Sequence, residues 1–246
     1  MNTYHWIFLS PHLDDVALSC GGLVWNLTQT GHKVEVWTLM AGLPPEGNYS
    51  PFAQQVHANW GISGWEAIKA RRVEDQAACA VLGAKMRHFD WPDVIYRRDA
   101  LTGEPIVNNN DELFNRSPEP ELVNAMAEML EKELPEGVHR VMPIGLGEHV
   151  DHQALVKAAA QAGGGEYYYA DYPYILERFD SPAFHSSQWE KMPHDLSEEA
   201  LQAWQAAVLC YTSQLSTFWR NDAETRLALR NYLAGGGGRL WVKTTP

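Results

Sequence analysis

The segment HWIFLSPHLDD, residues 5–15, combines an apolar run with a turn that carries one histidine and two aspartates. Its first six residues are typical of a buried strand, because large apolar side chains follow one another without alternating with charged ones. Pro11 ends this strand, and apolar residues then recur at helical spacing from Asp15 to Gly31. The segment therefore predicts a strand, a turn and a helix, with polar side chains at the carboxyl end of the strand.

The alternation of strand and helix continues along the chain. This order is typical of an α/β protein whose parallel sheet is covered by helices. We therefore expect a Rossmann-like, mostly parallel sheet with helices on both faces, a three-layer sandwich that residues 1–246 form as one domain. The predicted strands are 33–40, 86–90, 138–144, 166–170 and 238–244, and the predicted helices are 66–82, 118–134, 151–162, 197–210 and 222–234.

Two long stretches, 41–63 and 91–117, have no clear periodicity. The first is rich in glycine and proline, which favours a loop. Loops of this length are uncommon in compact domains and often form lids or binding surfaces. We expect both stretches to line the binding pocket.

Composition excludes several classes of protein. The chain has 31 acidic against 19 basic residues, a net charge of -12, and such a surface repels nucleic acid. Cys20, Cys79 and Cys210 are widely spaced and form no Cys-x-x-Cys pair, which excludes a disulfide framework and a thiolate zinc site and favours three buried side chains. No segment is typical of a secretion signal or a membrane span, so a cytoplasmic protein is expected. Whether it is a monomer or a homo-oligomer stays open.

Two clusters of histidine and aspartate carry the chemistry. Residues 12–15 (HLDD) follow the first predicted strand, and residues 149–152 (HVDH) follow the strand that ends near Ile144. Ligands bind at the carboxyl ends of the strands in an open parallel sheet, so both clusters are expected at one edge. Each cluster alone also fits an ordinary helix N-terminus. Their shared position favours a metal site.

Two imidazoles and one carboxylate are a standard ligand set for catalytic zinc. We expect His12, Asp15 and His152 to hold the ion, which would lower the pKa of its water to about 7 and polarise a carbonyl group. Asp14 is then free to take a proton from that water as the catalytic base.

Two further residues are expected to assist. His149 would donate a hydrogen bond or a proton to the developing oxyanion or to the leaving amine. Asp151 would hold the imidazole of His149 in one tautomer. The tyrosines at 167–169, 172 and 174 fit either a sugar-stacking face or strand packing, and we expect packing.

At these residues the sequence resembles the PIG-L/LmbE-like family of metal-dependent de-N-acetylases. The family pairs a His-x-Asp-Asp turn after the first strand with a His-x-Asp-His segment late in the chain. Its first helix and its Arg-x-x-Glu helix are also similar to segments of this sequence, as are two weaker features. The matching segments are 12–15 (HLDD), 149–152 (HVDH), 18–22 (LSCGG), 71–74 (RRVE), 91–93 (WPD) and 211–214 (YTSQ).

The resemblance implies an LmbE-like fold and hydrolysis of an N-acetyl group, usually on a glucosamine unit, with zinc or sometimes ferrous iron as the ion. It assigns the ligands and the base to the residues named above, and His149 to stabilisation of the tetrahedral intermediate. It also assigns Arg71 to substrate hydroxyls, for which an exposed helix charge is the alternative.

Two positions depart from the family pattern. Leu13 stands where the family has proline, with Pro11 placed before the histidine, and Val16 stands where it has glutamate. None of the expected ligands is lost. The missing glutamate removes an expected hydrogen-bond partner near the site.

The sequence therefore predicts a metal-dependent hydrolase that removes the N-acetyl group of an N-acetylglucosamine-type sugar or conjugate. One alternative is an amidase that acts on another acylated amine or on a thiol conjugate. Another is a metal-containing module that binds a sugar without turning it over. The presence of Asp14 and His149 argues against binding alone, because binding requires no base beside the ion.

Overall fold

The computed structural model describes the chain except for residues 1–2, 46, 48, 177–187, 194 and 245–246. A seven-stranded sheet has the order β3-β2-β1-β4-β5-β7-β6. Strands β1 to β5 pair in parallel, and β7 pairs antiparallel with β5 and β6. The expectation of a mostly parallel sheet is therefore confirmed. The strands are β1 (His5–Ser10), β2 (Lys33–Thr38), β3 (Lys85–His88), β4 (His139–Pro143), β5 (Tyr167–Tyr169), β6 (Trp189–Lys191) and β7 (Leu240–Lys243).

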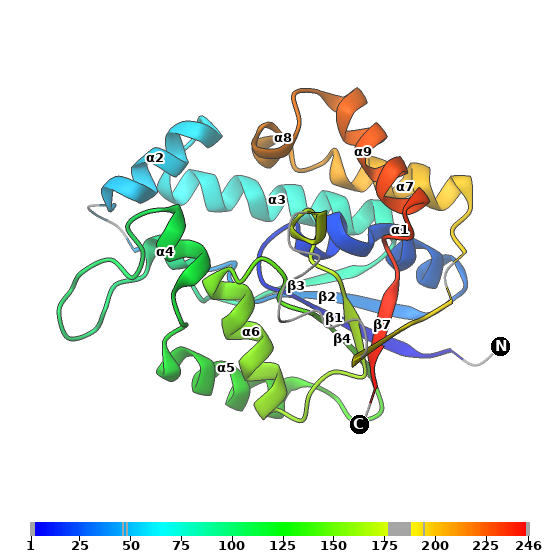
Figure 1. The fold of residues 1–246 in the computed structure, drawn as a ribbon, viewed down its shortest axis with the longest axis horizontal. Helices are drawn as coiled ribbons and strands as arrows, with labels where there is room; N and C mark the ends of the chain where they lie inside the picture. The colour runs from blue at the N-terminus through cyan, green and yellow to red at the C-terminus, as the bar shows by residue number, and fades with distance from the viewer. Residues whose placement is uncertain (1–2, 46, 48, 177–187, 194, 245–246) are drawn as a thin grey trace.

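Helices cover both faces of the sheet. Figure 1 shows α1, α3, α7 and α9 above it and α5 and α6 below it, which confirms the three-layer arrangement. No helix in the described ranges is long and apolar enough to cross a membrane. The helices are α1 (Asp15–Gln29), α2 (Pro51–Trp60), α3 (Gly64–Leu82), α4 (Asn110–Asn115), α5 (Pro120–Glu133), α6 (Val150–Gln161), α7 (Glu198–Val208), α8 (Thr212–Phe218) and α9 (Asp222–Ala234), with 3₁₀ turns η1 (Val94–Tyr96) and η2 (Tyr174–Leu176).

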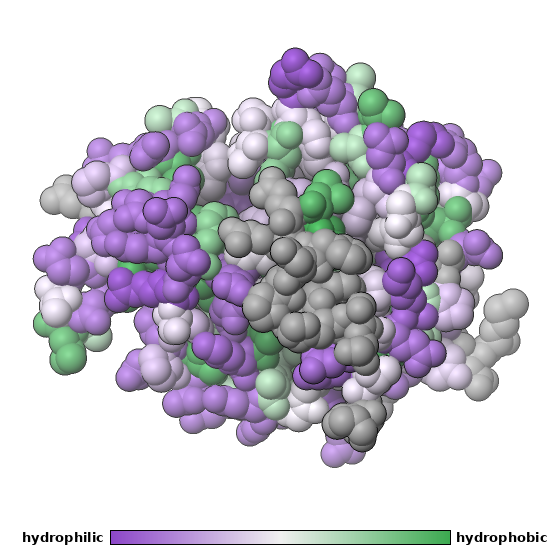
Figure 2. All heavy atoms as spheres, in the orientation of Figure 1, coloured by the Kyte–Doolittle hydropathy of each residue, from purple (hydrophilic) through white to green (hydrophobic). Residues whose placement is uncertain are grey.

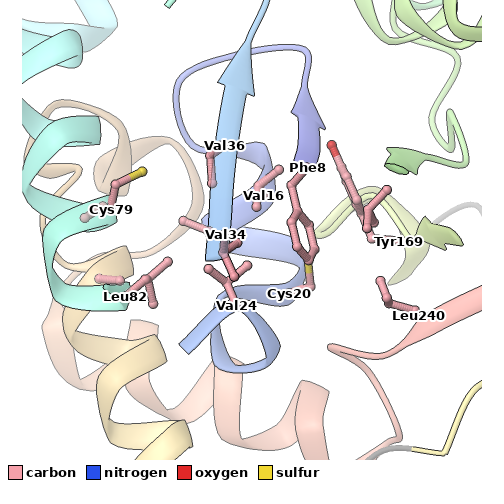
Figure 3. Close-up of a cluster of buried hydrophobic side chains, with 14 of the residues drawn as sticks. Phe8, Val16, Cys20, Val24, Val34, Val36, Cys79, Leu82, Tyr169 and Leu240 are labelled. Carbon is pink, nitrogen blue, oxygen red and sulfur yellow. The ribbon is translucent and has the colours of Figure 1, made fainter. Parts of the chain in front are cut away.

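Strand β1 lies at the centre of the sheet and is buried on both faces. Ile7 and Leu9 pack into the core that α5 and α6 cover, whereas Phe8 packs into the core that α1 and α3 cover. Figure 3 shows Phe8 beside Val16 and Cys20 in the second of these cores. This two-sided burial explains why β1 is apolar at successive positions.

The cysteines behave largely as expected. Cys20 and Cys79 are buried, Cys210 is half-buried, and all three are free thiols. Burial raises the pKa of the Cys20 thiol, so it contributes to the core as an apolar group.

The two long stretches contain helices that their periodicity did not predict. Helix α2 lies within 41–63 and begins at Pro51. The side chain of Ser50 caps it by accepting a hydrogen bond from the amide of Ala53. Turn η1 and helix α4 lie within 91–117. Helix α4 has no buried residue, and Figure 2 shows hydrophilic side chains over this part of the surface. Strand β6 and helix α8 were also not predicted.

The strand order brings the two motifs to one place. Strands β1 and β4 are parallel neighbours, so the loops that leave their carboxyl ends meet at one edge of the sheet. The first loop leads into α1 and the second leads into α6. The ends of these two strands and the first turns of these two helices therefore build the site.

Candidate metal centre and active site

The histidines of the two motifs form one buried cluster. The ring centroid of His12 lies 4.9 Å from that of His149 and 5.4 Å from that of His152. Both connecting loops are strained: Asp14 (φ 157°) and Glu148 (φ 60°) are the positive-φ residues other than glycine among those the structure describes. Such conformations persist where the surrounding structure holds them, and they concentrate at functional sites.

Asp15 lies between two imidazoles. Its Oδ2 atom is 3.3 Å from Nδ1 of His12, and its Oδ1 atom is 3.4 Å from Nε2 of His152. Within the described residues, Nε2 of His152 is fully buried and has no hydrogen-bond partner. A buried nitrogen without a hydrogen-bond partner destabilises the folded protein unless a ligand or a metal ion binds it. The structure thus brings together the three residues that the sequence analysis selected as ligands.

His152 is held from its other side by Asp171. Oδ1 of Asp171 lies 2.7 Å from Nδ1 of His152, and its Oδ2 accepts hydrogen bonds from the amides of Gly145 and Leu146. A carboxylate behind a histidine that faces a metal fixes the tautomer and the ring orientation. The sequence analysis missed Asp171. Its position just beyond β5, the strand beside β4, was the signal that would have revealed it.

Asp151 does not hold His149, as the sequence analysis expected. Its Oδ2 lies 3.0 Å from Nε2 of His12 and accepts a hydrogen bond from the backbone amide of Val94. Its Oδ1 accepts a hydrogen bond from Nη1 of Arg97 at 2.6 Å. At the start of α6 the backbone amide of Asp151 points to His149, and its carboxylate points away toward His12. The corrected role is therefore a partner of His12.

His149 presents a hydrogen-bond donor. Its Nδ1 accepts a hydrogen bond from the backbone N–H of Asp151 at 3.1 Å. Because a backbone N–H can only donate, the proton of the neutral ring is on Nε2. Burial lowers the pKa of His149 well below its usual range, and the nearby rings of His12 and His152 lower it further. The ring is therefore neutral and its Nε2–H is available to a ligand.

Asp14 and Arg71 face each other beside this cluster. Nη2 of Arg71 lies 3.6 Å from Oδ2 of Asp14, and the guanidinium lies 5.1 Å from the ring centroid of Trp60. Burial raises the pKa of Asp14 to about 7, although Arg71 acts in the opposite direction. Arg71 is only 5% exposed, so an exposed helix charge is the wrong interpretation of this residue.

The donor set is compatible with a metal ion. Ligand atoms of His12, His149 and His152 all lie within 4.8 Å of one another, as do those of a second group, His12, Asp93 and Asp151. In the second group, the carboxylate of Asp151 is already occupied by the hydrogen bonds described above. His12, Asp15 and His152, whose Nε2 is orphaned, are the better match to a divalent ion.

A cavity of about 500 Å³ is lined by residues of the two long stretches and not by the residues of the cluster. Both long stretches contribute to it, the first through Tyr49 and Ser50 and the second through Tyr96 and Arg97. Arg97 connects its wall to the cluster, because the same side chain binds Asp151. The stretches that were expected to line a pocket thus line this cavity.

Comparison with known proteins places this geometry in context. The family model PIG-L, described as GlcNAc-PI de-N-acetylase, matches residues 7–163 and so includes both motifs. The chain is 29% identical over 242 residues to a 2'-N-acetylparomamine deacetylase of Niallia circulans, which covers 90% of this chain and 85% of that protein.

Solved structures agree over almost the whole chain. The zinc-inhibited form of teicoplanin deacetylase Orf2 is similar with a TM-score of 0.80 and 26% identity, covering 98% of each chain. The A40926 pseudoaglycone deacetylase Dbv21 is similar with a TM-score of 0.73 and 30% identity, covering 99% of this chain and 97% of that chain.

Proposed function

Because the chain belongs to the PIG-L family of de-N-acetylases, we propose that its buried histidine–aspartate cluster removes the acetyl group of an N-acetylglucosamine-type sugar or conjugate. The protein is a hydrolase of the N-deacetylase type. One observation carries the proposal: the unpartnered Nε2 of His152 converges with Asp15 and His12 while a second carboxylate, Asp14, stays beside them.

His12, Asp15 and His152 would hold a divalent ion, zinc in the first instance and ferrous iron as the alternative. Bound there, the ion would supply Lewis acidity, which activates water and polarises the acetyl carbonyl group. Asp171 and Asp151 orient His152 and His12 through hydrogen bonds. The convergence of two nitrogens on the carboxylate of Asp15 supports Asp15 rather than His149 as the third ligand.

Asp14 acts as the base. It takes a proton from the attacking water as the oxygen–carbon bond forms, and it delivers that proton to the nitrogen as the carbon–nitrogen bond breaks. The Nε2–H of His149 donates a hydrogen bond to the oxyanion that develops on the carbonyl oxygen. The products are acetate and a free amine, so one water molecule is consumed in each turnover.

Arg71 and the cavity that the two long stretches line would hold the sugar. Nε of Arg71 is buried and has no hydrogen-bond partner in the described part of the chain, which supports a contact with substrate hydroxyls. The cavity that Tyr49, Ser50 and Tyr96 line has room for a glycan residue or for part of an attached group.

Acetate release is the direct test. The chelated protein would be assayed alone and after addition of zinc or ferrous iron, with N-acetylglucosamine, 2'-N-acetylparomamine, an N-acetylated A40926 pseudoaglycone and an N-acetylated thiol conjugate. Because one relative was solved in a zinc-inhibited form, zinc would be added from below to above equimolar amounts. We expect release from the sugar substrates that depends on the metal.

The other outcomes assign the site differently. Release from the thiol conjugate alone would support the amidase alternative. Metal binding and sugar binding without any acetate release would support a non-catalytic module and contradict the proposed hydrolysis.

A further inference from the structure

Tyr174 lies against the metal cluster, although neither motif contains it. It begins η2, three residues after Asp171, the carboxylate that holds His152. Its ring meets the imidazole of His152 edge to face, with centroids 5.6 Å apart and an interplanar angle of 83°. It also meets Phe114 of α4 at 5.8 Å and 67°, and Phe114 in turn lies 5.5 Å from His149.

Gly147 allows this approach. A Cβ atom at Gly147 would lie 2.8 Å from Cγ of Tyr174 and 3.0 Å from its Cβ, which is closer than real side chains come. Gly147 also has a φ of +85°, a conformation that glycine adopts without strain. The loop between β4 and α6 therefore leaves room for the tyrosine ring, and three neighbours fix its position.

The hydroxyl of Tyr174 has no hydrogen-bond partner among the residues that the structure describes, whereas the hydroxyl of Tyr169 donates to the carbonyl of Leu9. Burial raises the pKa of Tyr174, and the carboxylates of Asp15 and Asp14 raise it further. Tyr174 is partly buried, and a phenol whose pKa is raised stays protonated and is a donor.

We propose that the hydroxyl of Tyr174 donates a hydrogen bond to the acetyl carbonyl oxygen of the substrate and to the oxyanion that forms from it. This inference rests on the proposed deacetylation. Tyr174 and His149 are then two donors to one oxygen, both packed against Phe114. Two converging donors are the usual composition of a site that stabilises a tetrahedral intermediate.

Tyr172 provides a matched control two residues away. Its ring stacks on Tyr232 with centroids 4.2 Å apart, and it lines a different, largely apolar cavity of about 410 Å³. Burial alone raises the pKa of Tyr172 to about 12, with no contribution from the carboxylates of the metal cluster. Removal of this hydroxyl tests the effect of losing a tyrosine oxygen from the same segment.

The test compares Tyr174→Phe and Tyr172→Phe with the wild-type holoenzyme. Loss of one donor to an oxyanion lowers kcat by about 100- to 1,000-fold. We expect this loss in Tyr174→Phe, with KM and bound metal close to wild type, and wild-type kinetics in Tyr172→Phe. A methylphosphonamidate analogue of the substrate, which imitates the tetrahedral intermediate, should lose affinity for Tyr174→Phe by a similar factor. The affinity for the deacetylated product, the free amino sugar, should not change.

Each other result overturns the inference. Unchanged kcat in Tyr174→Phe removes the hydroxyl from the reaction, and loss of metal from this variant assigns Tyr174 to the positioning of His152 instead. An equal loss in Tyr172→Phe assigns the effect to the fold of the segment. If the wild-type holoenzyme releases no acetate in the same assay, the proposed deacetylation fails, and the role of Tyr174 fails with it.

Discussion

Asp14 and Asp15 are adjacent in the sequence, but their carboxylates have opposite surroundings. Burial by itself would raise the pKa of Asp15, but His152 and His12 outweigh it and hold that pKa well below its usual range. Asp14 faces a single guanidinium at 3.6 Å, and burial dominates there. This difference supports a ligand role for Asp15 and a proton-transfer role for Asp14.

The first prediction concerns these two carboxylates. Asp14→Asn should retain its metal and lose about 100- to 10,000-fold in kcat, because the amide cannot accept a proton from water. Asp15→Asn is the matched control and should lose the metal itself. Steady-state kinetics and metal analysis of both proteins measure this, and undiminished activity in Asp14→Asn would exclude it as the base.

The second prediction concerns Asp171. Asp171→Asn should weaken metal affinity by about 10- to 100-fold, because it weakens the hydrogen bond that orients His152. Competition with a chelator measures the affinity without depending on turnover. Asp90→Asn is the control, since that carboxylate is exposed and pairs with Arg72. Equal affinities of the two variants would argue against the orienting role.

At the scale of elements, helix α2 lies in stretch 41–63, which was expected to be a loop, and it contacts the residues around the site. His57 lies 2.8 Å from the hydroxyl of Tyr96 in η1, and Trp60 stacks on the guanidinium of Arg71 in α3. The helix forms because Ser50 caps its first turn and Gly61 ends it in a left-handed conformation. Its periodicity was not visible in the sequence, since few of its residues are buried.

The third prediction follows from the contact between α2 and α3. Trp60→Leu should raise KM by about 3- to 30-fold and change kcat less, because a cation–π contact of about 0.5–2 kcal/mol no longer holds Arg71 toward the sugar. Trp65→Leu on the neighbouring helix is the control, as its ring contacts Lys69 instead. Steady-state assays that measure KM and kcat separately test this prediction. A fall in kcat with unchanged KM would contradict the role of Trp60 in holding Arg71 toward the sugar.

At the scale of the whole molecule, a buried chain of charges joins distant segments. Arg97 binds Glu119, which precedes α5, and Asp151 at the start of α6, and Asp151 binds His12 beyond β1. The side chain of Arg97 is only 9% exposed and that of Asp151 is fully buried, whereas that of Glu119 is 23% exposed. These contacts connect the site to the helices on one face of the sheet.

The fourth prediction tests that chain. Arg97→Met should lower the free energy of unfolding by about 3–5 kcal/mol, because the fully buried carboxylate of Asp151 would lose its charged partner. Arg230→Met removes an exposed pair with Glu198 and should cost at most about 1 kcal/mol. Chemical denaturation of the two metal-free variants measures both, and equal losses would contradict a special role for burial.

We propose that residues 1–246 are one domain. The last strand, β7, joins the same sheet as β1 and pairs with β5, so the end of the chain completes the layer that its beginning starts (Figure 1). Limited proteolysis of the holoenzyme should therefore give no stable fragment that ends between β4 and β7.

The sequence alone determined the features that depend on near neighbours. The uninterrupted apolar run of β1 predicted a buried strand, and helical periodicity predicted α1 and α3 nearly to their ends. The alternation of strands and helices predicted a parallel sheet, and so predicted that both His–Asp motifs follow parallel strands. The final strand, β7, was also predicted, but its antiparallel direction was not, because direction depends on the path of the chain between strands. Short β6 and helix α2 were not predicted, since few residues repeat in each.

Tertiary structure decided which side chain faces which. Asp151 turned out to bind His12 rather than His149, and Asp171, far from both motifs, turned out to bind His152. Tyr174 reaches the cluster because Gly147 leaves room for its ring. The direction of a side chain at the start of a helix depends on the strands and loops that pack around it, and strand order, not sequence spacing, sets those neighbours.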